Sequence, residues 1–518
     1  MRPTRPVVAA ALPAVGSMVV ALVLQSRTLL PDVAFWDTAE FQAIGAVLGI
    51  AHPTGYPTYT LLAWLASVLL QPFGSEAVRA NLLSALLVAG SCAVVAVAIE
   101  RLTGRRLMAL GAGICLAVVP TVWRIGVRAD AHALHLFLVA LLAVLLLVWA
   151  DRSRSAPDSG GRWLVAAAVV AGLALGNHAL TLLLAPGVAA FVLLVDPWLP
   201  VRRWRTAVGC VIALVVTTVG VYAYLPIRSA MDPPLDYADP ETLTALRYVV
   251  FGEQFRGTFS PLPSLADGVA LVGRILTTDM GLLAPVALAG AVVTALRWPR
   301  LGVLTIAWFV LTVIFALGYV NARIDRYYLV PLLIAVLWAA LAVTTVLDHG
   351  LRALRQGQAD PRSHGVGRRR PGSAVAMTII AAVILVAPVA AVVPGQFDDI
   401  DASRETEARR WLDATFLALE EDAVIVSWWS FSTTMWYGRF VERRRPDITI
   451  IDDRTILDEG LGNVVSVIER FRPERPVYVI RLDRDLPELE ALFDLQRVPG
   501  IPSIGVIYRV AGTGAVVR

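Results

Sequence analysis

Long apolar runs recur along most of this chain, and they constrain its fold more than any other feature. A helix needs about 20 mostly apolar residues to cross the hydrocarbon core of a bilayer, and eleven runs approach that length. The chain is 57% hydrophobic with a mean hydropathy of +0.67, well above the apolar share of a soluble protein. These runs predict a mostly α-helical, polytopic membrane protein. The expected spans are residues 7–26, 79–100, 107–123, 131–150, 163–178, 180–196, 206–227, 281–297, 301–319, 327–347 and 374–394.

Arginine residues indicate how these spans are oriented. Alternate connections are rich in arginine, and basic loops of membrane proteins concentrate in the cytoplasm. We therefore expect a cytoplasmic N-terminus in the plasma membrane, with the first run an uncleaved anchor and the basic linker 348–373 also cytoplasmic. Eleven spans would then place the C-terminal region outside. The segment 58–72 is too short for a span and is expected to be interfacial or re-entrant.

The composition changes after Pro394, which suggests a second domain. Residues 1–395 are expected to form the membrane domain, with a first external loop at 32–78, and residues 396–518 a small extracytoplasmic α/β domain. Trp428, Trp429, Trp436 and Tyr437 follow its first strand, where packing against the membrane domain is favoured over stacking on sugars. Strands are expected at 423–427, 448–451, 477–480 and 504–510, and helices at 402–420, 461–472 and 486–494.

The stretch 32–59, DVAFWDTAEFQAIGAVLGIAHPTGYPTY, follows the first expected span. It holds two acids, Asp37 and Glu40, and then a rigid run from His52 to Pro57. Apolar residues at helical spacing between them predict a short amphipathic helix. The acids have two interpretations that remain open. They fit a capping box with Asp37 at the N-cap, or they belong to a reaction centre at the membrane surface.

Further polar residues gather on the outer side once the spans are oriented, including four of the six histidines. An ionisable group within a span costs about 2.5–3.5 kcal/mol on insertion scales, so such groups usually face a cavity. Each residue singly is explained by a helix cap, a satisfied histidine or an interfacial arginine, but their convergence favours an outer polar cavity. Besides the two acids, the candidate site residues are His52, Tyr56, Arg128, Asp130, His132, Asn177, His178, Arg228 and Asp325.

Composition and spacing argue against several other kinds of site. Asp130, His132, His135 and His178 have metal-ligand chemistry, but helical residues i and i+2 point apart, so no metal site is predicted from Asp130 and His132. The three cysteines have no zinc or disulfide spacing. The net charge of +4 does not indicate a nucleic-acid partner.

An external segment at 228–280 is expected to carry a surface helix at 241–251. The following residues, 251–257, mix aromatic and charged side chains. They suit either a loop over the mouth of the cavity or an interfacial aromatic belt, and the sequence favours neither.

The run Asp37-Thr38-Ala39-Glu40, followed by His52-Pro53-Thr54-Gly55-Tyr56-Pro57, resembles the signature of the O-mannosyltransferase-like GT-C membrane glycosyltransferases. That signature is Asp-x-Gly-Glu followed by His-Pro-Pro-Gly-Tyr-Pro. The resemblance covers most of the membrane domain, and the C-terminal region matches only in outline. Asp130-Ala131-His132 stands where the family has Glu-Val-Tyr, which changes the reach of that acid. Further matches are the segments at 79–84, 172–178 and 224–228.

The resemblance implies an inverting glycosyltransferase. It would move a sugar from a polyprenyl-phosphate donor in the bilayer to a hydroxyl of a protein or glycan acceptor at the outer face. Mannose is the expected sugar. Asp37 would be the base that removes the acceptor's proton, with Glu40 orienting it or raising its pKa. Arg128 and Arg228 would neutralise the lipid phosphate, and no metal or nucleotide cofactor would be required.

Two other classes of function fit the sequence less well. A transporter or flippase of a lipid-linked sugar would show inverted repeats or polar breaks at mid-membrane, and the sequence has neither. A scaffold whose external domain recruits partners would leave the buried charges unexplained.

Overall fold

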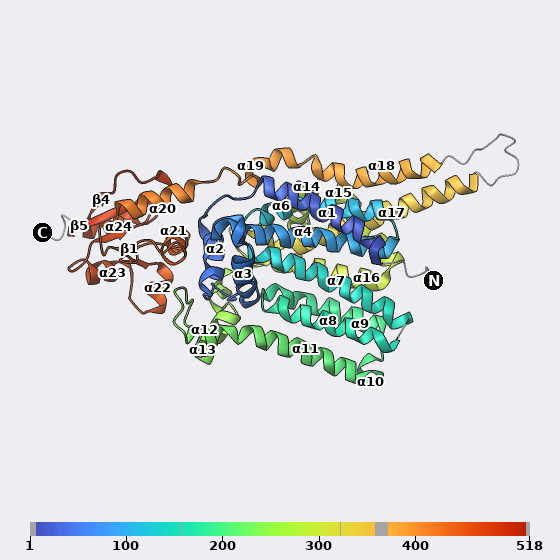
Figure 1. Cartoon of the computed structure of the whole chain (residues 1–518), viewed down its shortest axis with the longest axis horizontal. Helices are drawn as coiled ribbons and strands as arrows, with labels where there is room; N and C mark the ends of the chain where they lie inside the picture. Colours follow the sequence, from blue (N-terminus) through green and yellow to red (C-terminus); the bar gives the residue numbers. More distant parts are fainter. Residues whose placement is uncertain (1–6, 156, 322, 358–370, 514–518) are drawn as a thin grey trace.

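The computed structural model describes residues 7–155, 157–321, 323–357 and 371–513. Long helices run side by side along one axis, and the C-terminal region lies at one end of them, opposite the N-terminus (Figure 1). Half of the basic linker 348–373, including Arg362 and Arg368 to Arg370, lies outside the described residues. The helices of the bundle are α1 (Val7–Arg27), α4 (Glu76–Thr103), α5 (Arg106–Ala117), α6 (Pro120–Gly126), α7 (Ala131–Ser155), α8 (Pro157–Leu175), α9 (Ala185–Val195), α10 (Leu199–Arg202), α11 (Trp204–Tyr222), α15 (Leu283–Arg297), α16 (Pro299–Gly318), α17 (Leu329–Gly357) and α18 (Pro371–Ala390).

Six helices of the described chain are long and apolar enough to cross a membrane, or up to eight if each of two bent pairs forms one span. The first pair, α5 and α6, bends by 71° just before Pro120, because a residue that precedes proline disfavours helical backbone. The expected number of eleven spans is therefore not reached by this measure. Shorter apolar helices occupy several of the remaining expected positions.

The helices differ in how much of their surface is covered. Most residues of α17 are buried, whereas no residue of α11 is buried and many of its apolar side chains are exposed. Without water inside a bilayer, an exposed apolar helix is stable because lipid covers it. We therefore interpret α11 as a lipid-facing wall of the bundle.

Short elements cover the end of the bundle that faces the C-terminal region (Figure 1). The expected amphipathic helix in 32–59 is present. The helix expected at 241–251 is present too, but it is slightly shorter at both ends. These elements are α2 (Trp36–Val47), α3 (Pro57–Leu69), α12 (Tyr224–Ser229), α13 (Leu243–Val250) and α14 (Leu265–Met280).

A tight turn joins α2 to α3. The N–H of Gly55 donates to the carbonyl of His52 at 2.8 Å, and Gly55 has a φ of +79°. A Cβ at this position would lie 2.9 Å from the side chain of Leu225. Glycine is therefore needed both for the left-handed backbone and for the close approach of α12.

The C-terminal region is built around a five-stranded sheet in the order β2-β1-β3-β5-β4. β1 pairs in parallel with β2 and β3, and β5 pairs antiparallel with β3 and β4. The sequence missed β4, whose first residues were expected to be helical. The strands are β1 (Val424–Val426), β2 (Thr449–Ile451), β3 (Val477–Val479), β4 (Phe493–Arg497) and β5 (Tyr508–Thr513), and the helices α19 (Phe397–Ile400), α20 (Glu407–Ala418), α21 (Trp429–Trp436), α22 (Asp453–Asp458), α23 (Val464–Phe471) and α24 (Leu486–Leu492).

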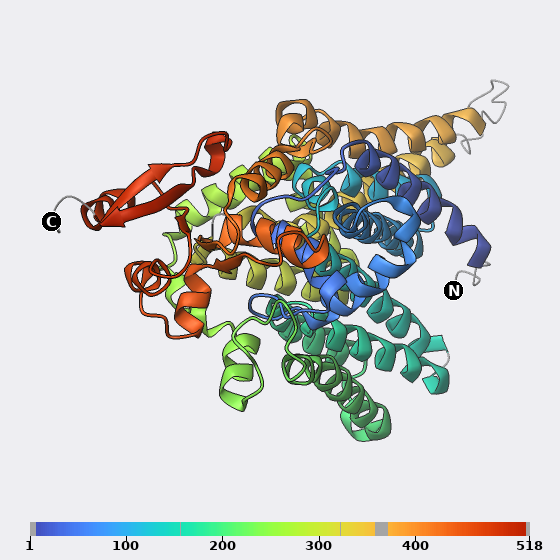
Figure 2. The same ribbon diagram turned by 60° about the vertical axis from the view of Figure 1, so that its left-hand side comes forward.

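The C-terminal region packs against the segment that contains α2 in both views (Figures 1 and 2). The ring of Phe35 lies edge-on to Trp411 and Phe431, with centroids 5.8 and 5.4 Å apart. Arg409 donates to Asp32 at 2.8 Å. These contacts fix α21, which begins at Trp429, against α2.

Candidate active site

Asp37 does not cap α2. The helix begins at Trp36, and its N-cap residue is Phe35, which makes no side-chain cap hydrogen bond. Glu40 does not reach back to the N-cap either, because both of its oxygens bind His52. The capping-box interpretation is therefore wrong, and both acids are available for another role.

Both oxygens of the Asp37 carboxylate accept hydrogen bonds from distant parts of the chain. Arg326 donates through Nη2 to Oδ2 at 2.8 Å, and Trp429 donates through Nε1 to Oδ1 at 3.0 Å. Burial raises the pKa of Asp37, but the charges of His52 and Arg326 outweigh burial and lower that pKa to about 2. Asp37 is therefore ionised at neutral pH.

Glu40 holds His52. Its Oε1 accepts from the backbone N–H of His52 at 2.8 Å, and its Oε2 bonds to Nδ1 of the same histidine. Burial lowers the pKa of His52, but the Glu40 carboxylate more than compensates and the pKa is raised above its usual value. The expectation that Glu40 orients Asp37 or raises its pKa is wrong, since Glu40 is occupied by His52 and the pKa of Asp37 is lowered.

This pair predicts a pH dependence of stability. A group whose pKa is raised by folding stabilises the fold fully below its unfolded pKa, about 6.5 for histidine, and that contribution is lost as pH rises through the folded pKa. The melting temperature in detergent should therefore fall as the pH rises above about 6.5 and through the raised pKa of His52, and Glu40→Gln should flatten this fall. Glu100→Gln is the control, because that buried carboxylate pairs with Arg106. If the melting temperature falls equally with pH in the wild type and in both variants, Glu40 does not raise the pKa of His52.

Arg326 links Asp37 to a second carboxylate. Its Nη1 lies 3.6 Å from Oδ2 of Asp130. Asp130 precedes α7, and its Oδ1 accepts from the backbone N–H of His132 at 2.8 Å and lies 2.9 Å from Nδ1. The expectation that Asp130 and His132 point apart is wrong, because only His132 lies within the helix. One guanidinium thus lies between two acids.

A layer of buried rings lies beside these acids. The ring of His178 lies 4.8 Å from that of His132, 5.8 Å from that of His135 and 5.7 Å from that of Tyr56, between centroids. Nδ1 of His178 accepts from the backbone N–H of Leu180 at 3.1 Å. Within the described residues, no group of three or more His, Cys, Asp or Glu side chains has the arrangement of a metal site.

Four other candidate residues bind partners in neighbouring parts of the fold. Arg228 donates to the backbone carbonyls of Leu48 at 2.7 Å and Val47 at 3.2 Å, at the opposite end of α2 from Asp37. The structure therefore does not bring Arg228 to the acids. The other three pairs are Arg128 with Glu405, Asp325 with Arg124, and the amide of Asn177 with the carbonyl of Ala131, each at 3.0 Å.

Sequence reasoning missed the two donors to Asp37. Arg326 lies in the polar turn that supplied the candidate Asp325, so its adjacent position was a usable signal. Trp429 was expected to pack against the membrane domain, and it does contact His52, with ring centroids 5.7 Å apart. Its hydrogen bond to Asp37 joins residues 392 positions apart, which no local pattern reveals.

Comparison with known proteins finds a sequence similar to part of this chain in protein O-mannosyl-transferases. Residues 37–199 match the model of the Protein O-mannosyl-transferase TMEM260 N-terminal domain. The chain is 30% identical over 234 residues to Protein O-mannosyl-transferase TMEM260 of Mus musculus, a match that covers 43% of this chain and 31% of that relative. The chain thus matches about a third of the relative's length.

Solved structures share the fold along nearly the whole chain. ArnT from Cupriavidus metallidurans, bound to undecaprenyl phosphate, has a TM-score of 0.61 at 15% identity, covering 98% of this chain and 99% of ArnT. The oligosaccharyltransferase AglB from Archaeoglobus fulgidus, in complex with an inhibitory peptide and a dolichol-phosphate, has a TM-score of 0.53 at 14% identity, covering 97% and 76%. The fold of this multi-pass membrane protein is therefore that of GT-C glycosyltransferases, and its resemblance to the O-mannosyltransferase-like family is confirmed.

Proposed function

We propose that this chain transfers a sugar, with mannose as the first candidate, from a polyprenyl-phosphate donor to an acceptor hydroxyl at the outer face of the membrane. The observation that carries the proposal is the carboxylate of Asp37, held by hydrogen bonds from Arg326 and Trp429 where the bundle meets the C-terminal region. The matched O-mannosyl-transferase and the lipid phosphates named for the two structural neighbours support this donor class.

The chemistry assigned to Asp37 is that of a general base. Asp37 takes the proton of the acceptor hydroxyl while the acceptor oxygen bonds to the anomeric carbon. The bond from that carbon to the phosphate oxygen breaks, its electron pair stays on the phosphate, and the configuration inverts. The residues themselves supply the base and the counter-charge, so the proposal includes no metal or nucleotide.

Arg326 replaces Arg128 and Arg228 as the proposed ligand of the donor phosphate. A carboxylate with a pKa of about 2 is a weak base, and catalysis is most efficient when the pKa of the base lies near the working pH. A donor phosphate that competes for Arg326 would remove positive charge from Asp37 and raise its pKa. Donor binding would thereby activate the base.

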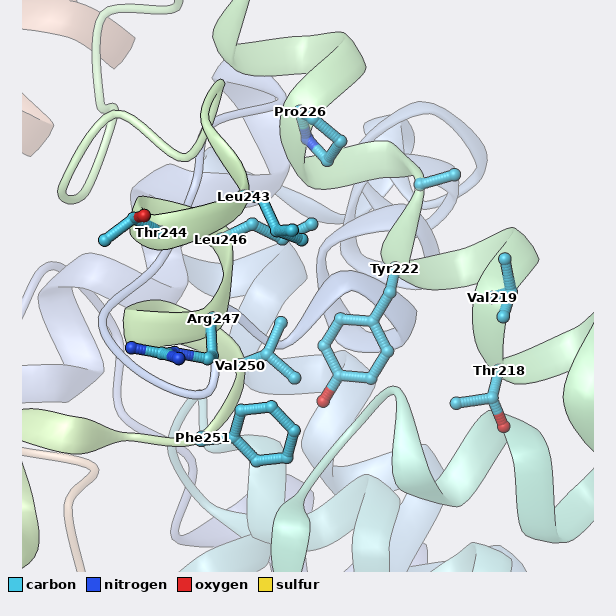
Figure 3. Close-up of a pocket in the computed structure, with 11 residues that line it drawn as sticks. Thr218, Val219, Tyr222, Pro226, Leu243, Thr244, Leu246, Arg247, Val250 and Phe251 are labelled. Carbon is cyan, nitrogen blue, oxygen red and sulfur yellow. The ribbon is translucent and has the colours of Figure 1, made fainter.

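An apolar groove offers a place for the lipid part of the donor. It has a volume of about 510 Å³ and lies between α11 and α13, with Tyr222, Leu246 and Phe251 among its walls (Figure 3). Because α11 faces lipid, a chain can enter the groove sideways from the bilayer. Val249 of α13 would lie 3.2 Å from a Cβ at Gly55, so the helix that forms one wall of the groove also packs against the turn that follows His52.

The test is a comparison of cells with and without this chain. Mass spectrometry of cell-surface proteins and glycans should show one class of hexose-modified hydroxyl disappear on deletion, and return with the wild-type gene but not with Asp37→Asn. If deletion leaves every surface hexose in place, transfer is not the function. If deletion removes them but Asp37→Asn restores them, Asp37 is not the base, and a transfer assay in vesicles then separates another base, Glu40 or Asp130, from a flippase that transfers no sugar.

A further inference from the structure

Arg454 of α22 binds the external segment that follows α12. Its guanidinium lies over the rings of Tyr237 and Tyr248, 4.7 and 5.0 Å from their centroids. Nη1 donates to the hydroxyl of Tyr248 at 2.8 Å and to Oε1 of Gln254 at 3.4 Å. The other edge of the guanidinium binds both oxygens of Asp458, with distances of 2.8 and 2.5 Å. We call these five residues the Arg454 clasp.

The clasp is connected to the carboxylate of Asp37. The ring of Tyr237 lies edge-on to Trp429, with centroids 6.1 Å apart, and Tyr237 also donates to Gln254. The indole of Trp429 lies between Tyr237 and His52 and donates to Asp37. Arg454 thus supports one side of the tryptophan that orients Asp37.

Arginine is suited to this arrangement because its planar guanidinium stacks on two rings while its edges donate hydrogen bonds. The side chain is only 15% exposed, and cation–π contacts strengthen when they are shielded from water. Asp458 orients the guanidinium, so little side-chain freedom remains to be lost on contact with the tyrosines. If the stack is lost, Tyr237 can move and Trp429 loses a neighbour on one side.

We propose that Arg454 is a positioning residue for the transfer reaction, acting through Tyr237 and Trp429 on Asp37. The inference rests on the proposed function. Arg454 does not touch the reacting atoms, so its removal should affect the geometry of the base more than the binding of the donor. A mispositioned base lowers kcat, because only interactions realised in the transition state change that constant.

The experiment uses the full chain in vesicles, with C55 polyprenyl-phosphate [³H]mannose as donor and envelope protein from cells lacking the chain as acceptor. Arg454→Gln should lower kcat about tenfold while the donor KM stays within about twofold. Arg454→Lys keeps the charge over the rings and should recover part of kcat. Arg470→Gln is the control, because Arg470 makes the same type of contact with Phe471 on α23 and should leave kcat unchanged.

A double-variant cycle tests the route of the effect. Trp429→Phe combined with Arg454→Gln should have nearly the kcat of Trp429→Phe alone, since residues acting in series are not additive. Additive losses, an unchanged kcat for Arg454→Gln, or a loss confined to KM would overturn the proposal. If the wild-type chain transfers no sugar, the proposed function fails; if it transfers sugar and only the Arg454 results disagree, the positioning role alone fails.

Discussion

Replacing Asp37 with asparagine should reduce sugar transfer by about 10²–10⁴-fold, the usual contribution of a general base. The amide cannot take the acceptor's proton, although its oxygen can still accept from Trp429. Donor binding should persist, because the proposed phosphate ligand is Arg326. The measurement is single-turnover transfer together with donor binding in vesicles. Asp37→Glu keeps a carboxylate with a different reach and should retain measurable transfer.

Asp267→Asn provides a matched control for this substitution. Asp267 also lies in the first turn of a helix, α14, but its side chain is exposed. Its loss should leave transfer unchanged. If Asp37→Asn transfers sugar at a near-normal rate, Asp37 is not the base, and Glu40 and Asp130 become the next candidates.

Replacing Arg326 with glutamine should affect both stability and transfer. Its side chain is only 12% exposed and serves both Asp37 and Asp130. Removing one partner of a buried ion pair costs about 3–5 kcal/mol of unfolding free energy, because the remaining charges are left uncompensated. Transfer should fall as well, since the proposed counter-charge for the lipid phosphate is lost. Denaturant unfolding in detergent and the vesicle assay measure the two effects.

Two further variants isolate the role of Arg326. Arg323→Gln removes an exposed arginine from the same turn, paired with Asp325 at 3.4 Å, and should change stability by no more than about 0.5 kcal/mol. Asp37→Asn combined with Arg326→Gln should be more stable than Arg326→Gln alone, because one uncompensated carboxylate is gone. A double variant of unchanged or lower stability would show that Arg326 does not neutralise Asp37.

Patterns within short stretches predicted much of the architecture. Apolar runs located the bundle helices, because a helix in lipid must be apolar along its whole length. The helical spacing of Phe41 and Ile44 predicted α2, and the run His52-Pro53-Thr54-Gly55-Tyr56-Pro57 predicted the turn after it. Span number was less well predicted, since bends such as that before Pro120 divide one apolar run into two helices.

The sequence by itself determined the class of protein, the position of α2 and the presence of acids and histidines in the turns that form the site. It also carried the motif of Asp37, Glu40 and His52, because those residues lie close together along the chain. Only the tertiary structure decided what each side chain binds. Arg326 and Trp429 reach Asp37 from 289 and 392 positions away, while Arg228 stabilises a helix end. Hydrogen-bond partners are set by the docking of α21 and the bundle on α2, and docking depends on whole packed surfaces that local residue patterns do not record.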